Sequence, residues 1–192
     1  KMIPGNFDIV VCDNTVGKIE NITNQKLKEL LLKNKFFILD KNIGSKNIGM
    51  GELDELIHVS EKVNFLDYDK VVYFTLRKIV TNPWLFEKVN QMTKDALISN
   101  PEFLQLKNDM NFTISPPTEN LYNDMFFAIK SNLMKDYVEY SKEKLKFNIR
   151  RGVGSEQNLY NFIKGKNMEY EWLNYLGLIR VDYKANNELQ LI

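Results

Sequence analysis

The 192-residue sequence has few of the residue types that build most metal and covalent catalytic sites. It contains one cysteine, Cys12, and one histidine, His58. A single cysteine excludes a disulfide framework within the chain and is compatible with a reducing compartment. A lone histidine is more often structural than catalytic, and the sequence shows neither a Cys/His cluster nor a Ser-His-Asp order. Structural zinc and the familiar serine hydrolases are therefore disfavoured.

Neither sign of charge predominates, and long apolar runs are absent. The chain has 26 basic and 25 acidic residues, a net charge of +1, with the signs interleaved. Dedicated nucleic-acid binders usually show a basic excess on some segment, so we expect no nucleic-acid partner. No apolar stretch reaches the ~20 residues that span a bilayer, and no secretory leader is seen. These absences predict a cytoplasmic protein, and a peripheral position at the inner face of the cytoplasmic membrane is compatible with them.

The composition that is present predicts one folded domain. Hydrophobic residues make up 44% and charged residues 27%, which is ordinary for a globular protein. A chain of this length can bury a sizeable core. No repeat, low-complexity segment or linker divides it, so we expect a single domain over residues 1–192.

The N-terminal half alternates strand and helix patterns. Residues 7–12 and 36–39 are short apolar runs typical of strands covered on both faces, and residues 23–33 between them form an amphipathic helix with Thr23 as the expected N-cap. A strand, helix and strand in this order favour a parallel crossover unit. The elements expected next are a glycine-containing loop at 40–51, a helix at 52–63 and a third strand at 71–75.

The C-terminal half shows mainly helical spacing. Helices are expected at 84–98, 118–147, 155–163 and 167–176, the third capped by Ser155, followed by a hairpin or edge strand from 179–183 and 188–192. The fold class predicted is α/β: a mixed sheet flanked by helices, with a helical C-terminal half and a terminal hairpin or edge strand.

Two N-terminal motifs suggest a ligand site. Asp13 and Asn14 end the strand at 7–12, where open α/β sheets place ligand groups, and a carboxylate there can accept hydrogen bonds from a ribose or a base. The alternative is an Asp that caps the next loop. In the loop at 42–51, glycines such as Gly44 allow close backbone approach, and Lys46 could meet a phosphate. The alternative there is a flexible loop without a ligand.

Charged residues later in the chain offer further candidates. Arg77 and Lys78 follow the third strand and could neutralise a diphosphate, or could form a solvated strand end. Glu156 lies in the first turn of a predicted helix, where a carboxylate can act as a general base or simply complement the helix dipole. Asp124, near the start of the long predicted helix, is another carboxylate.

Taken in order, these motifs resemble the GT-A-fold glycosyltransferases, especially the large inverting family that builds bacterial surface polysaccharides. The matching segments are VVCDN at 10–14, NIG at 42–44 with the helix from Glu52, YDKVVYF at 68–74, NDMFF at 123–127 and SEQ at 155–157. The resemblance spans roughly residues 7–181, although each motif is short and degenerate.

The resemblance implies a GT-A-like, Rossmann-type mixed sheet and a defined reaction. A sugar would pass from a nucleoside diphosphate, UDP or GDP, to a hydroxyl of a saccharide or lipid-linked acceptor, in capsule, lipooligosaccharide or glycoconjugate synthesis. Glu156 would be the catalytic base, and Asp124 would lie in the acceptor segment. Asp13 and Asn14 would contact the nucleotide.

Two departures from the family pattern stand out. Where the family has Asp-x-Asp, this chain has Thr75-Leu76-Arg77, which offers no carboxylate to a divalent metal. Either Arg77 or Lys78 replaces the cation, or catalysis is lost. The family also begins one strand and one helix before Phe7, so we expect that unit to be missing or different in this chain.

Two alternatives to a transferase remain. One is a winged-helix module for nucleic acid or protein contact, built from the helices predicted at 155–164 and 167–176 and the terminal strands. Glu169 and Glu171 on its second helix would repel phosphates. The other is a catalytically inactive GT-A-like domain that binds a saccharide or a partner enzyme.

Overall fold

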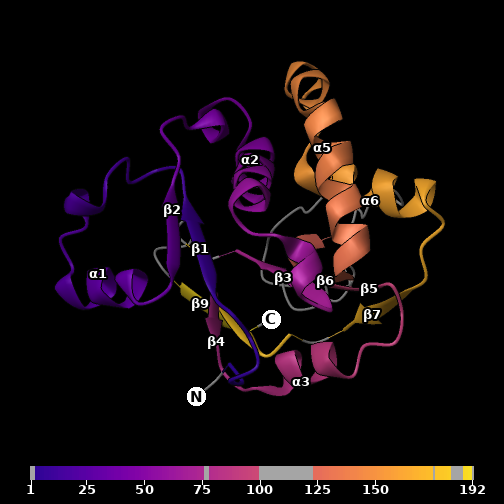
Figure 1. The fold of residues 1–192 in the computed structure, drawn as a ribbon, viewed down its shortest axis with the longest axis horizontal. Helices are drawn as coiled ribbons and strands as arrows, with labels where there is room; N and C mark the ends of the chain where they lie inside the picture. Colours follow the sequence, from indigo (N-terminus) through magenta and orange to yellow (C-terminus); the bar gives the residue numbers. More distant parts are fainter. Residues whose placement is uncertain (1–2, 76–77, 100–122, 175, 183–187, 192) are drawn as a thin grey trace.

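A four-stranded mixed sheet forms the centre of the fold (Figure 1). The computed structural model describes residues 3–75, 78–99, 123–174, 176–182 and 188–191. The strands of the central sheet, in their order across it, are β3 (Lys70–Phe74), β6 (Asn123–Lys130), β5 (Ala96–Ser99) and β7 (Tyr170–Leu173). β6 runs antiparallel to both of its neighbours, whereas β5 and β7 are parallel. The predicted α/β class, with a mixed sheet flanked by helices, is confirmed.

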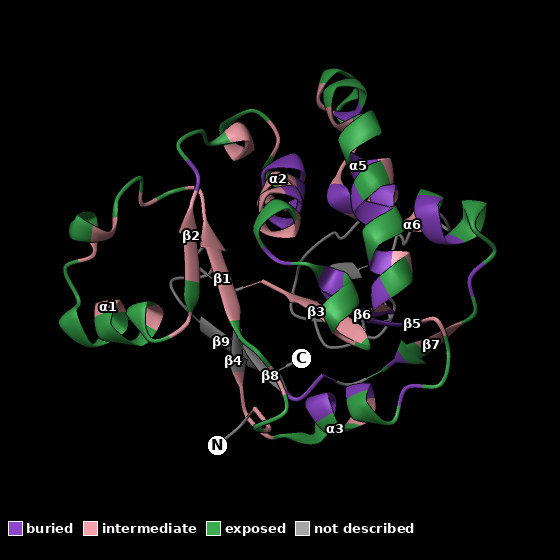
Figure 2. Ribbon diagram, in the orientation of Figure 1, coloured by how far each residue is buried: buried purple, intermediate pink, exposed green. Residues whose placement is uncertain are grey.

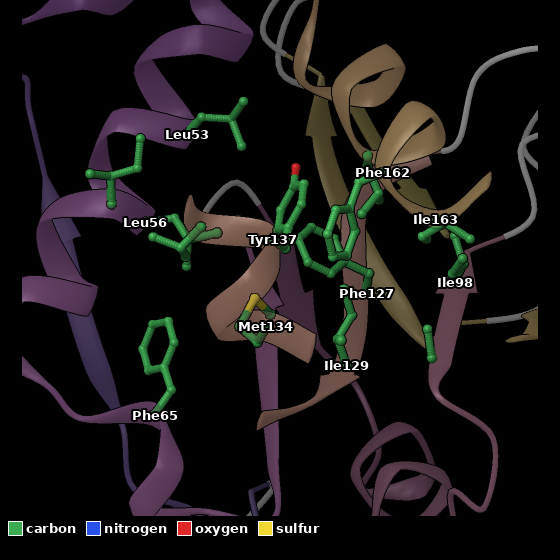
Figure 3. Packing of buried hydrophobic residues seen from close by; sticks show 14 of the residues in the cluster. Leu53, Leu56, Phe65, Ile98, Phe127, Ile129, Met134, Tyr137, Phe162 and Ile163 are labelled. Atoms are coloured by element: carbon green, nitrogen blue, oxygen red, sulfur yellow. The ribbon is translucent and has the colours of Figure 1, made fainter. Parts of the chain in front are cut away.

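The strands of this sheet send alternate side chains into two separate cores, as the two-residue period of a strand requires. The helices that cover the sheet are α2 (Ile48–Lys62), α5 (Ser131–Arg151) and α6 (Ser155–Gly165) on one face and α3 (Trp84–Asn90) on the other. Phe127 and Ile129 pack with the first group, as Figure 3 shows, and their neighbours Phe126 and Ala128 pack with α3. Both faces of β5 and β6 are therefore buried.

The N-terminal segment forms a second, smaller sheet. β1 (Val10–Asp13) and β2 (Lys35–Ile38) are parallel, with α1 (Gln25–Leu32) between them, so the predicted crossover unit is confirmed. The predicted burial of both faces is wrong. Within the described residues this sheet has two strands, and their residues are half-buried or exposed (Figure 2). Asn24, not Thr23, caps α1, since its side chain accepts a hydrogen bond from the Leu27 N–H at 3.0 Å.

A third sheet contains the predicted C-terminal hairpin. β8 (Leu178–Asp182) and β9 (Glu188–Leu191) pair in antiparallel fashion, and β4 (Lys78–Val80) adds to the other edge of β8. The short 3-10 helices of the described chain are η1 (Ile19–Asn21), η2 (Ile43–Ser45) and η3 (Phe65–Asp67). None of the helices in the described ranges is long and apolar enough to cross a bilayer.

The helices predicted at 84–98 and 118–147 are wrong in part and the one predicted at 167–176 is wrong, and each error falls on a strand of the central sheet. β5 occupies the end of the helix expected at 84–98, β6 replaces the start of the one expected at 118–147, and β7 lies within 167–176. Short apolar runs fit both periods, and here ladder pairing across the sheet outweighs the helical spacing. Since Glu169 and Glu171 therefore lie in or beside a strand, the winged-helix alternative lacks its second helix.

A buried polar network joins α5 to α6. The side chain of Asn158 on α6 accepts a hydrogen bond from the Asn148 amide at 2.8 Å and donates one to the Ser141 hydroxyl at 2.9 Å. Its amide also lies 3.5 Å from the Tyr137 hydroxyl. All four residues are buried. Because buried polar groups are costly unless they are paired, this network fixes how α6 sits against α5.

Replacing Asn158 with alanine would leave the buried Asn148 amide without its acceptor. We expect Asn158→Ala to lower the free energy of unfolding by about 2–3 kcal/mol, measured by urea denaturation. Asn161→Ala, at an exposed position of the same helix, is the control and should change it by less than about 0.5 kcal/mol. Equal effects of the two substitutions would contradict a structural role for the network.

Candidate functional site

Asp13 and Asn14 lie at the carboxyl end of β1. One oxygen of the Asp13 carboxylate, Oδ1, accepts hydrogen bonds from the backbone N–H of Thr15 at 2.8 Å and of Val16 at 2.6 Å. The Thr15 hydroxyl lies 3.1 Å from each carboxylate oxygen. The structure therefore shows the loop-capping arrangement that was the alternative for Asp13. The same contacts hold its half-buried carboxylate in one orientation at the strand end.

The glycine-containing segment packs directly on Asn14. The Asn14 side-chain amide lies 3.4 Å from the Gly51 carbonyl oxygen, to which it donates. Gly44 and Gly51 are so close that a Cβ on Gly51 would lie 2.6 Å from the Gly44 Cα. Only glycine, which lacks a Cβ, allows η2 and the first turn of α2 to pack this closely. The segment is thus structured rather than a flexible loop.

α2 also begins earlier than expected, at Ile48 instead of Glu52. Asn47 caps it, because the Asn47 side-chain oxygen accepts a hydrogen bond from the Met50 N–H at 3.2 Å. Lys46, next to this cap, is exposed. Of the glycines expected in a loop, Gly49 and Gly51 therefore lie within the first turn of α2, and Gly44 lies in η2.

The first turn of α2 meets the first turn of α6. The Asn47 side-chain amide donates to the Val153 carbonyl at 3.0 Å, and a Cβ on Gly49 would lie 2.6 Å from the Ser155 hydroxyl oxygen. Ser155 is buried and is the first residue of α6, so the cap predicted for it is wrong: Gly154 is the N-cap. Glu156 follows in that turn, half-buried, and accepts a hydrogen bond from the Ser155 hydroxyl at 3.4 Å.

Three motifs that are far apart in the sequence therefore lie together. Contacts lead from Asn14 to Gly51, and from Gly49, two residues earlier on the other side of α2, to Ser155 beside Glu156. We call this region, from the end of β1 across the start of α2 to the start of α6, the β1–α2–α6 junction. Two helix N-termini converge in it, and each carries partial positive charge.

The structure does not place two of the predicted site residues, Asp124 and Arg77, at this junction. Asp124 lies in β6, next to Asn123, which pairs with Ser99; the helix expected to begin there starts only at Ser131. Arg77 lies outside the described residues, and its neighbour Lys78 opens β4. The roles expected for Asp124 and Arg77 remain predictions.

Glu55 is a residue that the sequence patterns missed. It lies on α2 one turn after Gly51, and the Asn14 backbone N–H donates a hydrogen bond to its carboxyl group. Burial first, and then the nearby Asp13 carboxylate, raise the pKa of Glu55 to about 7. The available signal was its i, i+4 spacing from Gly51, which places both residues on one helix face.

Cys12 lies beside this carboxyl group. Burial, followed by the negative charge of Glu55, raises the pKa of the Cys12 thiol to about 12. The thiol therefore stays protonated near neutral pH, and a thiolate nucleophile is disfavoured.

Metal-binding groups do not gather anywhere in the described part of the chain: no three His, Cys, Asp or Glu side chains lie close enough together there to hold an ion. Thr75, where the sequence resemblance would align Asp-x-Asp, offers a single hydroxyl, which is a poor ligand set for a divalent cation. The described residues do not fit a metal site, so no chemical step is assigned to a metal.

Comparisons with known proteins give distant structural similarities. No family model and no curated protein matches the chain. The crystal structure of A197 from STIV is similar over 96% of this chain and 94% of that chain, with a TM-score of 0.43 and 15% sequence identity.

The glycine contacts of the junction make a direct prediction. A methyl group at Gly51 would meet the backbone of Gly44, which cannot rotate away as a side chain could. We expect Gly51→Ala to lower the free energy of unfolding by about 1–3 kcal/mol, measured by chemical denaturation. Gly165→Ala, where a Cβ would meet nothing within 4 Å, is the control and should be neutral or stabilising by up to about 1 kcal/mol. A destabilised control and an unaffected Gly51→Ala would contradict the packing described.

The raised pKa of Glu55 makes a second prediction. Between its ordinary pKa of 4.5 and its folded value of about 7, the folded protein holds this proton more tightly than the unfolded chain does. The stability that Glu55 contributes is therefore fully present below pH 4.5 and is lost as the pH rises through about 7. Glu55→Gln should show a smaller loss of stability across this window, measured as unfolding free energy against pH. Glu61→Gln, exposed on the same helix, should keep the slope of the original protein.

Proposed function

We propose that this chain is a glycosyltransferase that transfers a sugar from a nucleoside diphosphate to a hydroxyl of a saccharide or lipid-linked acceptor. Bacterial surface polysaccharide or glycoconjugate synthesis is the setting that the sequence resemblance suggests. The observation that carries the proposal is the β1–α2–α6 junction. Asp13 and Glu156 belong to different motifs of the resemblance, and packing brings both motifs to the same junction.

In this proposal the β1 end and the start of α2 hold the donor. Asp13 and Asn14 contact the nucleoside, as the resemblance implies. The diphosphate lies toward Gly44 and Lys46, beside the start of α2, where a helix N-terminus attracts an anion. Arg77 would add a bidentate cation on the diphosphate in place of a metal.

The transfer step needs one base and one leaving group. The Glu156 carboxylate accepts the proton of the acceptor hydroxyl as the hydroxyl oxygen attacks the anomeric carbon of the donor sugar. The bond from that carbon to the diphosphate oxygen breaks, and the nucleoside diphosphate leaves with the electron pair. The partial positive charge of the helix N-termini stabilises the developing negative charge. With its pKa of about 7, Glu55 is partly protonated at neutral pH. Its protonated form donates a hydrogen bond at the β1 end of the junction, where the sugar nucleotide binds.

Donor binding and transfer are tested separately. Ligands that bind the folded state raise the melting temperature, so a thermal-shift screen of UDP, GDP, CMP and dTDP sugars should identify one nucleotide. Transfer to saccharide acceptors is then measured with that donor. Glu156→Gln should keep the melting shift and lower the transfer rate about 10²–10⁴-fold, the usual contribution of a general base.

A first-turn glutamate of another helix provides the control. Glu87 lies in the first turn of α3, as Glu156 does in α6, so Glu87→Gln should leave both binding and rate unchanged. A melting shift without transfer by the original protein would favour the inactive saccharide-binding domain. If none of the sugar nucleotides changes the melting temperature, the proposal fails.

A further inference from the structure

The C-terminal end of α5 exposes an aromatic ring among basic side chains. Phe147 is 55% exposed. Lys144, Arg150 and Arg151 lie at helical spacings of three or four residues from it, so all four side chains share one face, and all are exposed. The Arg151 guanidinium lies 5.7 Å from the centroid of the Phe147 ring. The charge beside the ring is mainly positive, since Glu143 is the acidic residue at the same spacing.

A second apolar side chain lies nearby, at the start of α2. Ile48 is 66% exposed. It follows Asn47, whose side chain bonds to Val153, two residues after Arg151. We call Ile48, Lys144, Phe147, Arg150 and Arg151 the α5-end patch. Because the bond between Asn47 and Val153 also belongs to the β1–α2–α6 junction, the patch borders the candidate site.

The positive charge of the patch is not neutralised within the described structure. Among the ion pairs of the described structure, those of α5 join Lys142 to Glu61 and Glu139 and Asp136 to Lys166. None of the described ion pairs includes Lys144, Arg150 or Arg151. Unpaired cations around exposed apolar groups suit an anionic bilayer surface, where the apolar groups enter the headgroup boundary and the cations meet lipid phosphates. Nucleic acid would account for the charge but not for the exposed Ile48.

We propose that the α5-end patch docks the protein on an anionic membrane surface and turns the β1–α2–α6 junction toward that surface. Figure 1 shows the end of α5 projecting beyond the central sheet on the side where α2 lies. The inference goes beyond the proposed transfer reaction and does not depend on it, because docking is measured without donor or acceptor. A lipid-linked acceptor would meet the candidate site at such a surface.

Vesicle co-sedimentation tests this proposal. The protein should bind phosphatidylcholine vesicles that contain one-third phosphatidylglycerol and should bind pure phosphatidylcholine much more weakly. Each basic residue at such a surface is worth about fivefold in binding, so the double substitution Arg150→Ala with Arg151→Ala should weaken binding roughly 30-fold. Arg150→Lys with Arg151→Lys keeps the charge and should keep most of the binding. Phe147→Ser should weaken binding by about tenfold through lost apolar contact.

The control removes the same charge from another exposed helix. Lys26 and Lys28 lie on α1, which also exposes Leu27 and Leu30, so Lys26→Ala with Lys28→Ala tests whether any basic, apolar helix would serve. Its binding should stay within about twofold of the original. Circular dichroism melts should show all of these variants folded. The proposal is overturned if the α1 variant loses as much binding as the α5 variant. It is also overturned if the original protein does not prefer anionic vesicles, or if it binds RNA at low salt and leaves vesicles unbound.

Discussion

The arrangement of this molecule depends on the bare first turn of α2. Gly51 faces Gly44 and the end of β1, and Gly49 faces the start of α6, at distances that exclude any side chain. α2 is thereby held between the small N-terminal sheet and the helices of the central sheet. The same helix buries Leu53 and Leu56 in the larger core, so the junction and the core are coupled through one rigid element (Figure 3).

The polar network between α5 and α6 is the second constraint on the junction. Asn158 and Ser155 lie one turn apart on α6, so the hydrogen bonds that seat Asn158 against α5 also set where Ser155 meets Gly49. A buried network of this kind specifies one arrangement of the two helices, because a shift of one helix along the other would leave several buried polar groups without hydrogen-bond partners. Glu156 is consequently placed by backbone packing and buried amides, although its own side chain is only half-buried.

Two regions at and beside the junction differ in the charge of their side chains. On the β1 side, Cys12 and Glu55 are held toward their protonated forms by burial, with the oriented Asp13 carboxylate beside them. On the outer side, the exposed cations of the α5-end patch are unpaired in the described structure. The two proposals concern different regions of the molecule, the β1 side for the donor nucleoside and the α5-end patch for an anionic membrane surface, so they do not depend on each other.

Local sequence was sufficient for the elements whose pattern and surroundings agree. The β1–α1–β2 crossover, α2 with Leu53, Leu56 and Ile57 inward, β3 and the terminal hairpin were all predicted, because apolar period and turn residues point the same way there. Only the tertiary structure assigned β5, β6 and β7 to the central sheet. An apolar run such as Phe126–Ile129 fits a helix or a strand equally well until pairing partners decide.

The same division holds at the candidate site. The sequence singled out Asp13, Asn14, Gly44 and Glu156 by residue type and order, and segments carrying them contact the first turn of α2. Their roles remain predictions. The sequence could not identify Glu55, because the pKa of a carboxyl group depends on the burial and charges that surround it after folding. The sequence alone determined the types of the candidate residues and their order along the chain. Their contacts in space were decided by glycine packing and buried hydrogen bonds between segments far apart in the chain.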